Sequence, residues 1–63
     1  MEEAKKMFER IYPDAQINDV QEVNGKYVLE AEFSDGIYYH VVTSDTISRG
    51  YDDINRAIAA AMK

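Results

Sequence analysis

The chain has 63 residues, of which twelve are acidic and seven basic, so its formal net charge is -5 at pH 7. This length suits one small domain spanning residues 1–63, and the negative charge disfavours direct contact with nucleic acid. There is no cysteine, which excludes disulfides, thiolate zinc sites and cysteine nucleophiles.

The first predicted element is an amphipathic helix over residues 2–12. Its apolar residues recur at helical spacing, as in Met7, Phe8 and Ile11, and charged residues occupy the other positions. Pro13 should end this helix, because proline disfavours the α conformation in the residue before it.

Three strands follow, over residues 16–23, 26–33 and 37–43. The turn dipeptides Asn24-Gly25 and Asp35-Gly36 separate them, and both favour tight antiparallel hairpins. The first strand is the most polar, which is typical of an edge strand.

A second helix is predicted from Tyr51 or Asp52 to the end of the chain, after a loop over residues 44–50. Asp52 and Asp53 suit the positive end of its dipole. Its expected buried stripe consists of Ile54, Ala57, Ile58, Ala61 and Met62.

This order of elements predicts an α+β fold of the type α-β-β-β-α. We expect two layers, a three-stranded antiparallel meander with both helices packed on one face. The expected core contains Met7, Phe8, Ile11, Leu29, Phe33, Ile54, Ile58 and Met62.

The loop of the second hairpin decides which face carries His40. A two-residue loop, Asp35-Gly36, would place His40 on the same face as Leu29, whereas a three-residue loop over residues 34–36 would place it beside Glu30. One residue of slip exchanges the faces. We favour the three-residue loop, because it puts Ile37, Tyr39 and Val41 in the core and leaves both glutamates of the second strand in water.

That choice leaves one sheet face uncovered, with a mixed aromatic, aliphatic and acidic surface. We expect it to bind a protein partner, because exposed tyrosine among apolar residues is typical of interface cores. A solvated face without a function is the alternative. The candidate partner-binding residues are Val28, Glu30, Glu32, Tyr38, His40 and Val42.

Chemistry beyond binding has weak support. His40 is the only histidine; with Glu30 and Glu32 it could hold a metal, but a cross-strand ion pair between Glu30 and His40 explains the same pattern. We therefore expect no metal, no cofactor and no enzymatic activity. The serines next to turns should bond backbone groups rather than act as nucleophiles; they are Ser34, Ser44 and Ser48.

Two families share features with this chain. The order α-β-β-β-α is similar to that of the double-stranded RNA-binding domain, which grips phosphates with a lysine-rich start to its last helix. The matching segment here, residues 49–53, has one base and two acids, so that binding chemistry does not carry over. Residues 4–45 also resemble a PepSY-type domain, with a helix ending in residues 12–15 before two hairpins. That resemblance implies an exported or membrane-associated protein.

The sequence as a whole predicts a small acidic, non-catalytic module that binds another protein. A basic partner would suit its charge, and nucleic-acid-handling proteins are common basic partners, so an inhibitor or decoy of the kind phages use is expected. The alternative is a partnerless scaffold, either a designed protein or an isolated structural domain; a small-molecule binder would instead show a pocket lined by Tyr27, Tyr39 or Tyr51. A homodimer through the open face or the third strand is a further expectation. Without a signal-peptide pattern or a long apolar run, we expect a cytoplasmic protein that does not contact membranes.

Overall fold

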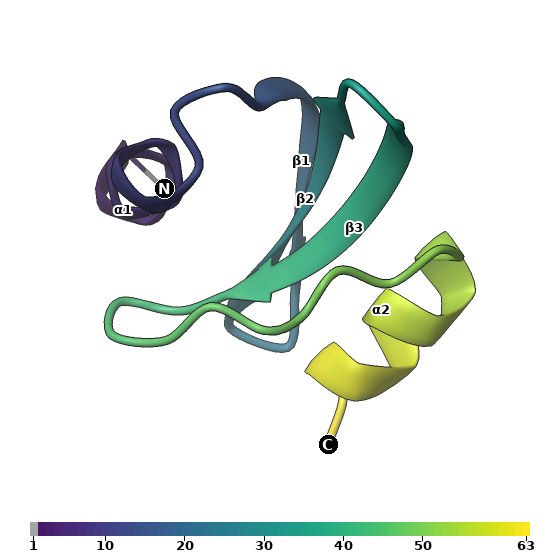
Figure 1. Cartoon of the computed structure of the whole chain (residues 1–63). Helices are drawn as coiled ribbons and strands as arrows, with labels where there is room; N and C mark the ends of the chain where they lie inside the picture. The colour runs from purple at the N-terminus through teal and green to yellow at the C-terminus, as the bar shows by residue number, and fades with distance from the viewer. Residues whose placement is uncertain (1) are drawn as a thin grey trace.

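The computed structural model of the protein describes residues 2–63 and shows a helix, a three-stranded sheet and a second helix (Figure 1). The elements are α1 (Glu2–Ile11), β1 (Gln16–Val23), β2 (Lys26–Phe33), β3 (Gly36–Val42) and α2 (Ile54–Ala61). The strands form an antiparallel meander with β2 in the centre. The predicted α+β class, the order of elements and the meander are therefore confirmed.

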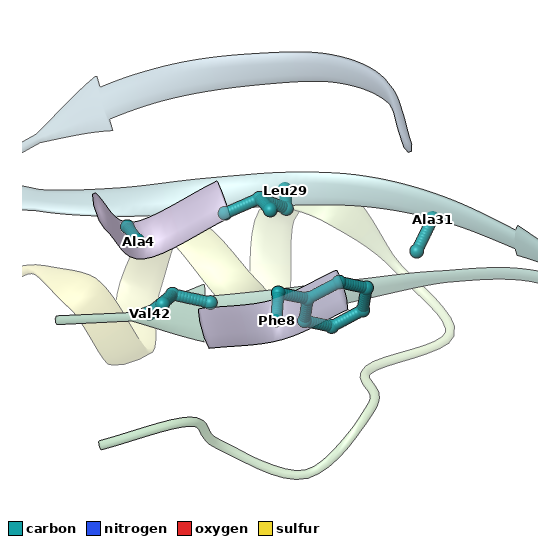
Figure 2. Packing of buried hydrophobic residues seen from close by; sticks show 5 residues of the cluster. All are labelled: Ala4, Phe8, Leu29, Ala31 and Val42. Carbon is teal, nitrogen blue, oxygen red and sulfur yellow. The ribbon is translucent and has the colours of Figure 1, made fainter. Parts of the chain in front are cut away.

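Helix α1 packs onto one face of the sheet through Ala4 and Phe8, which are both buried. In Figure 2 these two side chains lie in one cluster with Leu29 of β2 and with Val42 of β3. The helical hydrogen-bond pattern ends when the Tyr12 amide donates to the Phe8 carbonyl oxygen at 2.8 Å. Pro13 follows at once and prevents a further turn.

Helix α2 begins at Ile54, later than predicted, because Asp53 is its N-cap. Asp53 is extended, with φ -139° and ψ 128°, and its side chain accepts a hydrogen bond from the Asn55 amide at 2.7 Å. Such a cap satisfies an amide that has no partner within the helix. The buried residues of α2 are the small ones, Ala57 and Ala61.

The two helices lie on opposite faces of the sheet, so the expected packing of both on one face is wrong. Successive strand residues point to opposite faces, and β2 buries both Val28 and Leu29. Leu29 packs with the α1 cluster, whereas Val28 packs with Ala57 and Ala61 of α2. Figure 1 shows the sheet between the helices, a three-layer arrangement that the two-sided apolar stretch of β2 requires.

The free edge of β3 is covered by the segment that leads to α2. Tyr39 and Tyr51 exchange two backbone hydrogen bonds of 2.8 and 2.7 Å, and the Ser48 amide donates to the Val41 carbonyl oxygen at 2.9 Å. These bonds occupy backbone groups of Tyr39 and Val41 that a second copy would need in order to pair along the third strand. The exposed edge is β1, whose pairing with β2 is interrupted between Ile17 and Asp19.

The second hairpin has a register that differs from the one we favoured. Phe33 pairs with Gly36, so the loop contains two residues, Ser34 and Asp35, and Leu29 pairs with His40. The preferred three-residue loop is wrong. His40 shares a face with Leu29, as a two-residue loop predicts, although the loop starts one residue earlier than Asp35. This register buries His40 under α1 and turns the glutamates of β2 to the other face.

The core is smaller and richer in alanine than predicted. Phe8 and Leu29 are fully buried as expected, but Ile11 and Met62 are 55% and 65% exposed. Alanines bring the helices close to the sheet, so the long residues at the helix ends extend beyond it. The buried apolar residues are Ala4, Phe8, Val28, Leu29, Ala31, Val41, Val42, Ala57 and Ala61.

Candidate functional site

The six residues predicted to bind a partner do not share one face. Tyr38, His40 and Val42 lie on the α1 side of the sheet, opposite to the glutamates of β2. His40 and Val42 are buried beneath α1, and Val28 is buried beneath α2. The expected uncovered face with all six residues is therefore wrong.

The α2 side carries an acidic patch near the β2–β3 turn, which we call the acidic sheet face; Glu30 and Tyr39 in it are half-buried, and its other residues are exposed. The register places Asp19 of β1 opposite Glu30, Glu30 opposite Tyr39, and Glu32 opposite Ile37. Ile37 is an aliphatic side chain left 45% exposed. The acidic sheet face consists of Asp19, Glu30, Glu32, Ile37 and Tyr39.

The carboxylates of the acidic sheet face have no cationic partner among residues 2–63. Within residues 2–63 the one ion pair is Asp52–Arg56 on α2, at 4.0 Å and with both side chains mostly exposed. Glu32 accepts a hydrogen bond from the Asn18 side chain at 3.1 Å, which leaves its charge uncompensated. Loss of hydration and the neighbouring charge of Glu30 raise the pKa of Tyr39, and a hydrogen bond to the Glu30 side chain adds to this shift.

On the other side of the sheet, His40 is buried among aromatic rings. Its centroid lies 4.9 Å from that of Phe8, 5.4 Å from that of Tyr12 and 6.0 Å from that of Phe33. The ring Nδ1 lies 3.0 Å from the carbonyl oxygen of Ser48. A carbonyl can only accept, so Nδ1 carries the hydrogen and Nε2 keeps its lone pair. Burial lowers the pKa of His40, against a smaller raising effect of the Ser48 bond, and so favours this neutral form.

A pocket of about 290 Å³ opens beside His40, and we call it the His40 pocket. Its aromatic walls are Phe33 and Tyr38, whose ring centroids are 5.8 Å apart. Asp35 stands at its rim and accepts a hydrogen bond from the Tyr38 hydroxyl at 3.2 Å; the Asp35 charge raises the pKa of Tyr38. Gly50 completes the lining.

A second hollow of similar volume shares Gly50 but is lined mainly by polar residues. Tyr51, one of the three tyrosines named for a small-molecule pocket, lies in it. The Arg49 guanidinium sits 5.1 Å from the centroid of the Tyr51 ring, which is cation–π distance. Asp52 and Arg56, the ion pair of α2, form the rest of the wall.

The metal site and the ion pair considered for His40 require it to lie beside Glu30 and Glu32, and it does not. Glu30 and Glu32 lie on the opposite face of the sheet, which separates them from His40 as metal ligands and as ion-pair partners. Among residues 2–63 no three His, Asp or Glu side chains are grouped so as to hold a metal. The Ser48 hydroxyl accepts from the Val41 amide and donates to the Arg49 carbonyl oxygen, both at 2.8 Å, as expected for a serine that bonds backbone.

Sequence reasoning missed the residues of the His40 pocket other than Tyr38 and His40. The sequence predicts Asp35 as a turn residue, Gly50 as part of the loop before the second helix, and Phe33 as core. The useful signal was whether the β2–β3 loop has an even or an odd number of residues, since a two-residue loop brings Tyr38 and His40 to the face of Phe33. Contact with Gly50 could not be foreseen, because it depends on how the irregular segment folds back along β3.

Comparison with known proteins gives no relative from which a function could be transferred: no family model, curated protein or solved structure matches the chain. Neither helix of the described residues has the length and apolar character needed to cross a membrane.

Proposed function

We propose that this protein binds a basic surface of another protein through its acidic sheet face. The observation that supports the proposal is the position of Glu30 and Glu32 beside the exposed Ile37, with no cation of residues 2–63 paired to them. Unpaired carboxylates around an apolar residue suit a partner that has lysine or arginine around an apolar contact.

The net charge of -5 adds long-range attraction to this contact. Complementary charge steers encounter and accelerates association, and salt weakens both effects. Proteins that handle nucleic acid have such basic surfaces, where they contact phosphates. In this proposal the protein acts as an inhibitor or decoy, with its carboxylates in the place of phosphates.

A pull-down with matched charge variants tests the proposal. Glu30→Gln with Glu32→Gln lowers the net charge to -3 on the acidic sheet face, and Glu3→Gln with Glu9→Gln does the same on α1. We expect the wild type and the α1 variant to retain the same protein at low salt, and the sheet-face variant to lose it. Purified partner should then bind with a dissociation constant that rises with salt and with added duplex DNA.

Three results would contradict the proposed binding, and a fourth would contradict only the decoy role. Equal loss in both double variants would show attraction by net charge alone, and equal retention would place the contact elsewhere. A chain that retains nothing would favour the partnerless scaffold. Competition by salt without competition by DNA would keep the basic partner but exclude the decoy role.

A further inference from the structure

The His40 pocket has a different chemistry from the acidic sheet face and lies on the opposite side of the sheet. Its histidine is only 3% exposed, although histidine is a polar side chain. Nδ1 is satisfied by the Ser48 carbonyl oxygen, but Nε2 receives no hydrogen bond from residues 2–63. Every buried side-chain nitrogen or oxygen of residues 2–63 has a partner, so the unpaired Nε2 is not sealed off but open to water, and a ligand donor can take the place of that water.

The position of Nε2 shows where that donor would come from. A methyl group placed on Gly50 would lie 3.2 Å from Nε2 and 3.2 Å from Cβ of Tyr38. Gly50 therefore approaches Nε2 closely, and both residues line the pocket. Any side chain at position 50 would crowd the acceptor.

The other polar side-chain groups of the pocket also favour a donor. Asp35 uses Oδ2 to accept from the Tyr38 hydroxyl, and its Oδ1 takes no hydrogen bond from residues 2–63. The Tyr38 hydroxyl has already donated its hydrogen. The unpaired side-chain atoms are therefore two acceptors, one of them anionic, between the aromatic walls of Phe33 and Tyr38.

We propose that the His40 pocket binds a guanidinium group, which donates to Asp35 and to Nε2 of His40 and packs on Phe33 and Tyr38. A guanidinium is planar, carries five N–H donors and is weakly hydrated, so it enters an aromatic pocket more easily than an ammonium does. The volume of about 290 Å³ is at the small end for ligand sites and fits one such group with its stem. The same chain packs its own Arg49 on Tyr51 nearby, which is the same contact type.

The group could belong to a free small molecule or to an arginine side chain, and three probes separate these sources. They are methylguanidinium, N-acetyl-arginine amide and N-acetyl-citrulline amide, the last being a neutral isostere of the second. Titrations are followed by NMR on the ring protons of His40, Tyr38 and Phe33 and on the Gly50 amide. We expect both guanidinium probes to shift these signals with millimolar dissociation constants, and the citrulline probe to leave them in place.

The relative affinity of the two guanidinium probes identifies the source. Tighter binding of the arginine amide assigns the pocket to an arginine side chain, and equal binding assigns it to a small guanidinium compound. Equal binding of arginine and citrulline amides would overturn the proposal, because the charge would then be irrelevant. So would the absence of shifts at tens of millimolar probe.

Two variants and a control locate the site. Asp35→Asn removes the anion, and Gly50→Ala fills the space beside Nε2 without changing the charge; each should weaken binding by about threefold or more. Asp45→Asn makes the same charge change beyond the other end of β3 and should leave the affinity unchanged. Equal weakening by Asp35→Asn and Asp45→Asn would indicate diffuse electrostatics and overturn the proposal. Asp35 is exposed in the hairpin loop, so its variant keeps the test valid even if Gly50→Ala disturbs the fold.

Discussion

His40 and Ser48 join the third strand to the segment that covers its edge. The Nδ1–H of His40 donates to the Ser48 carbonyl oxygen at 3.0 Å, and the Ser48 hydroxyl accepts from the Val41 amide at 2.8 Å. The Ser48 amide in turn donates to the Val41 carbonyl oxygen. These three bonds fix the irregular segment against β3, and one of them requires the proton of His40 to stay on Nδ1.

The stability of the protein should fall as the pH drops below neutral, because of His40. Burial lowers the pKa of His40 in the folded state, whereas in the unfolded chain it titrates near its ordinary value of about 6.5. From about pH 6.5 downward the unfolded chain binds the proton more readily, so the free energy of unfolding decreases until the lower folded pKa is passed. Urea unfolding at pH 7.5, 6.5 and 5.5 should show this decrease, at no more than about 1.4 kcal/mol per pH unit from one group.

The control for the pH effect is a variant that lacks His40. Tyr12, which directly follows α1, faces the ring, and Asp35 and Tyr38 share its pocket, so the variant must leave these groups in place. His40→Gln should flatten the pH dependence between 7.5 and 5.5, whatever it does to stability at pH 7.5. An unchanged slope in this variant would assign the effect to other groups.

Truncation of two apolar residues of α1 should have very different costs. Phe8 is fully buried against the sheet, and Phe8→Ala should destabilise the fold by about 3–5 kcal/mol, which is most of the stability of a domain this small. Ile11 is 55% exposed, and Ile11→Ala should cost less than about 1 kcal/mol. Thermal unfolding followed by circular dichroism measures both. Comparable losses would mean that α1 is rotated so that Ile11 also enters the core.

The contrast between Phe8 and Ile11 shows what the helical spacing of apolar residues can predict and what it cannot. The spacing located α1 and its buried stripe, because apolar residues recur every three or four positions. It could not say where along that stripe the sheet ends, and Ile11 extends beyond it. The same limit applies to Met62 at the end of α2.

The bounds of the strands could be predicted from the sequence. The faces of the sheet on which His40 and α2 lie could not. Turn dipeptides fix where strands end, and the bounds of β1 and β2 agree with the prediction. Register depends on which residues of the turn pair, and one residue of error moved His40 to the wrong face. The side taken by α2 depends on the path of residues 43–53, whose hydrogen bonds to β3 leave no periodic pattern in the sequence. Both errors affect the predicted partner-binding residues, of which only Glu30 and Glu32 lie on an open face.

The stability of the second hairpin should depend on whether residue 36 is glycine, an L-residue or a D-residue. Gly36 has φ +145°, a conformation that L-residues rarely adopt, and an added methyl group would have no atom of residues 2–63 within 4 Å. The cost of Gly36→Ala is therefore backbone strain alone, of the order of 1–3 kcal/mol. A chain of 63 residues can be synthesised, so D-alanine at position 36 is a matched control that places the same methyl group without this strain. Urea unfolding should rank glycine and D-alanine well above L-alanine, and equal loss with both alanines would point to crowding instead.

Because α2 packs on the sheet through its alanines, enlarging a buried alanine should cost more stability than enlarging an exposed one. Ala57 is fully buried against Val28 and Val41, whereas Ala59 is exposed on the same helix. Ala57→Leu should force the helix away from the sheet and destabilise the protein by about 1–3 kcal/mol. Ala59→Leu adds the same side chain with the same helix propensity in solvent, and should change stability by less than about 0.5 kcal/mol. Guanidinium chloride unfolding of the two variants compares them directly. If Ala59→Leu destabilises and Ala57→Leu does not, α2 presents its other side to the sheet, and the packing of Ala57 against Val28 and Val41 is wrong.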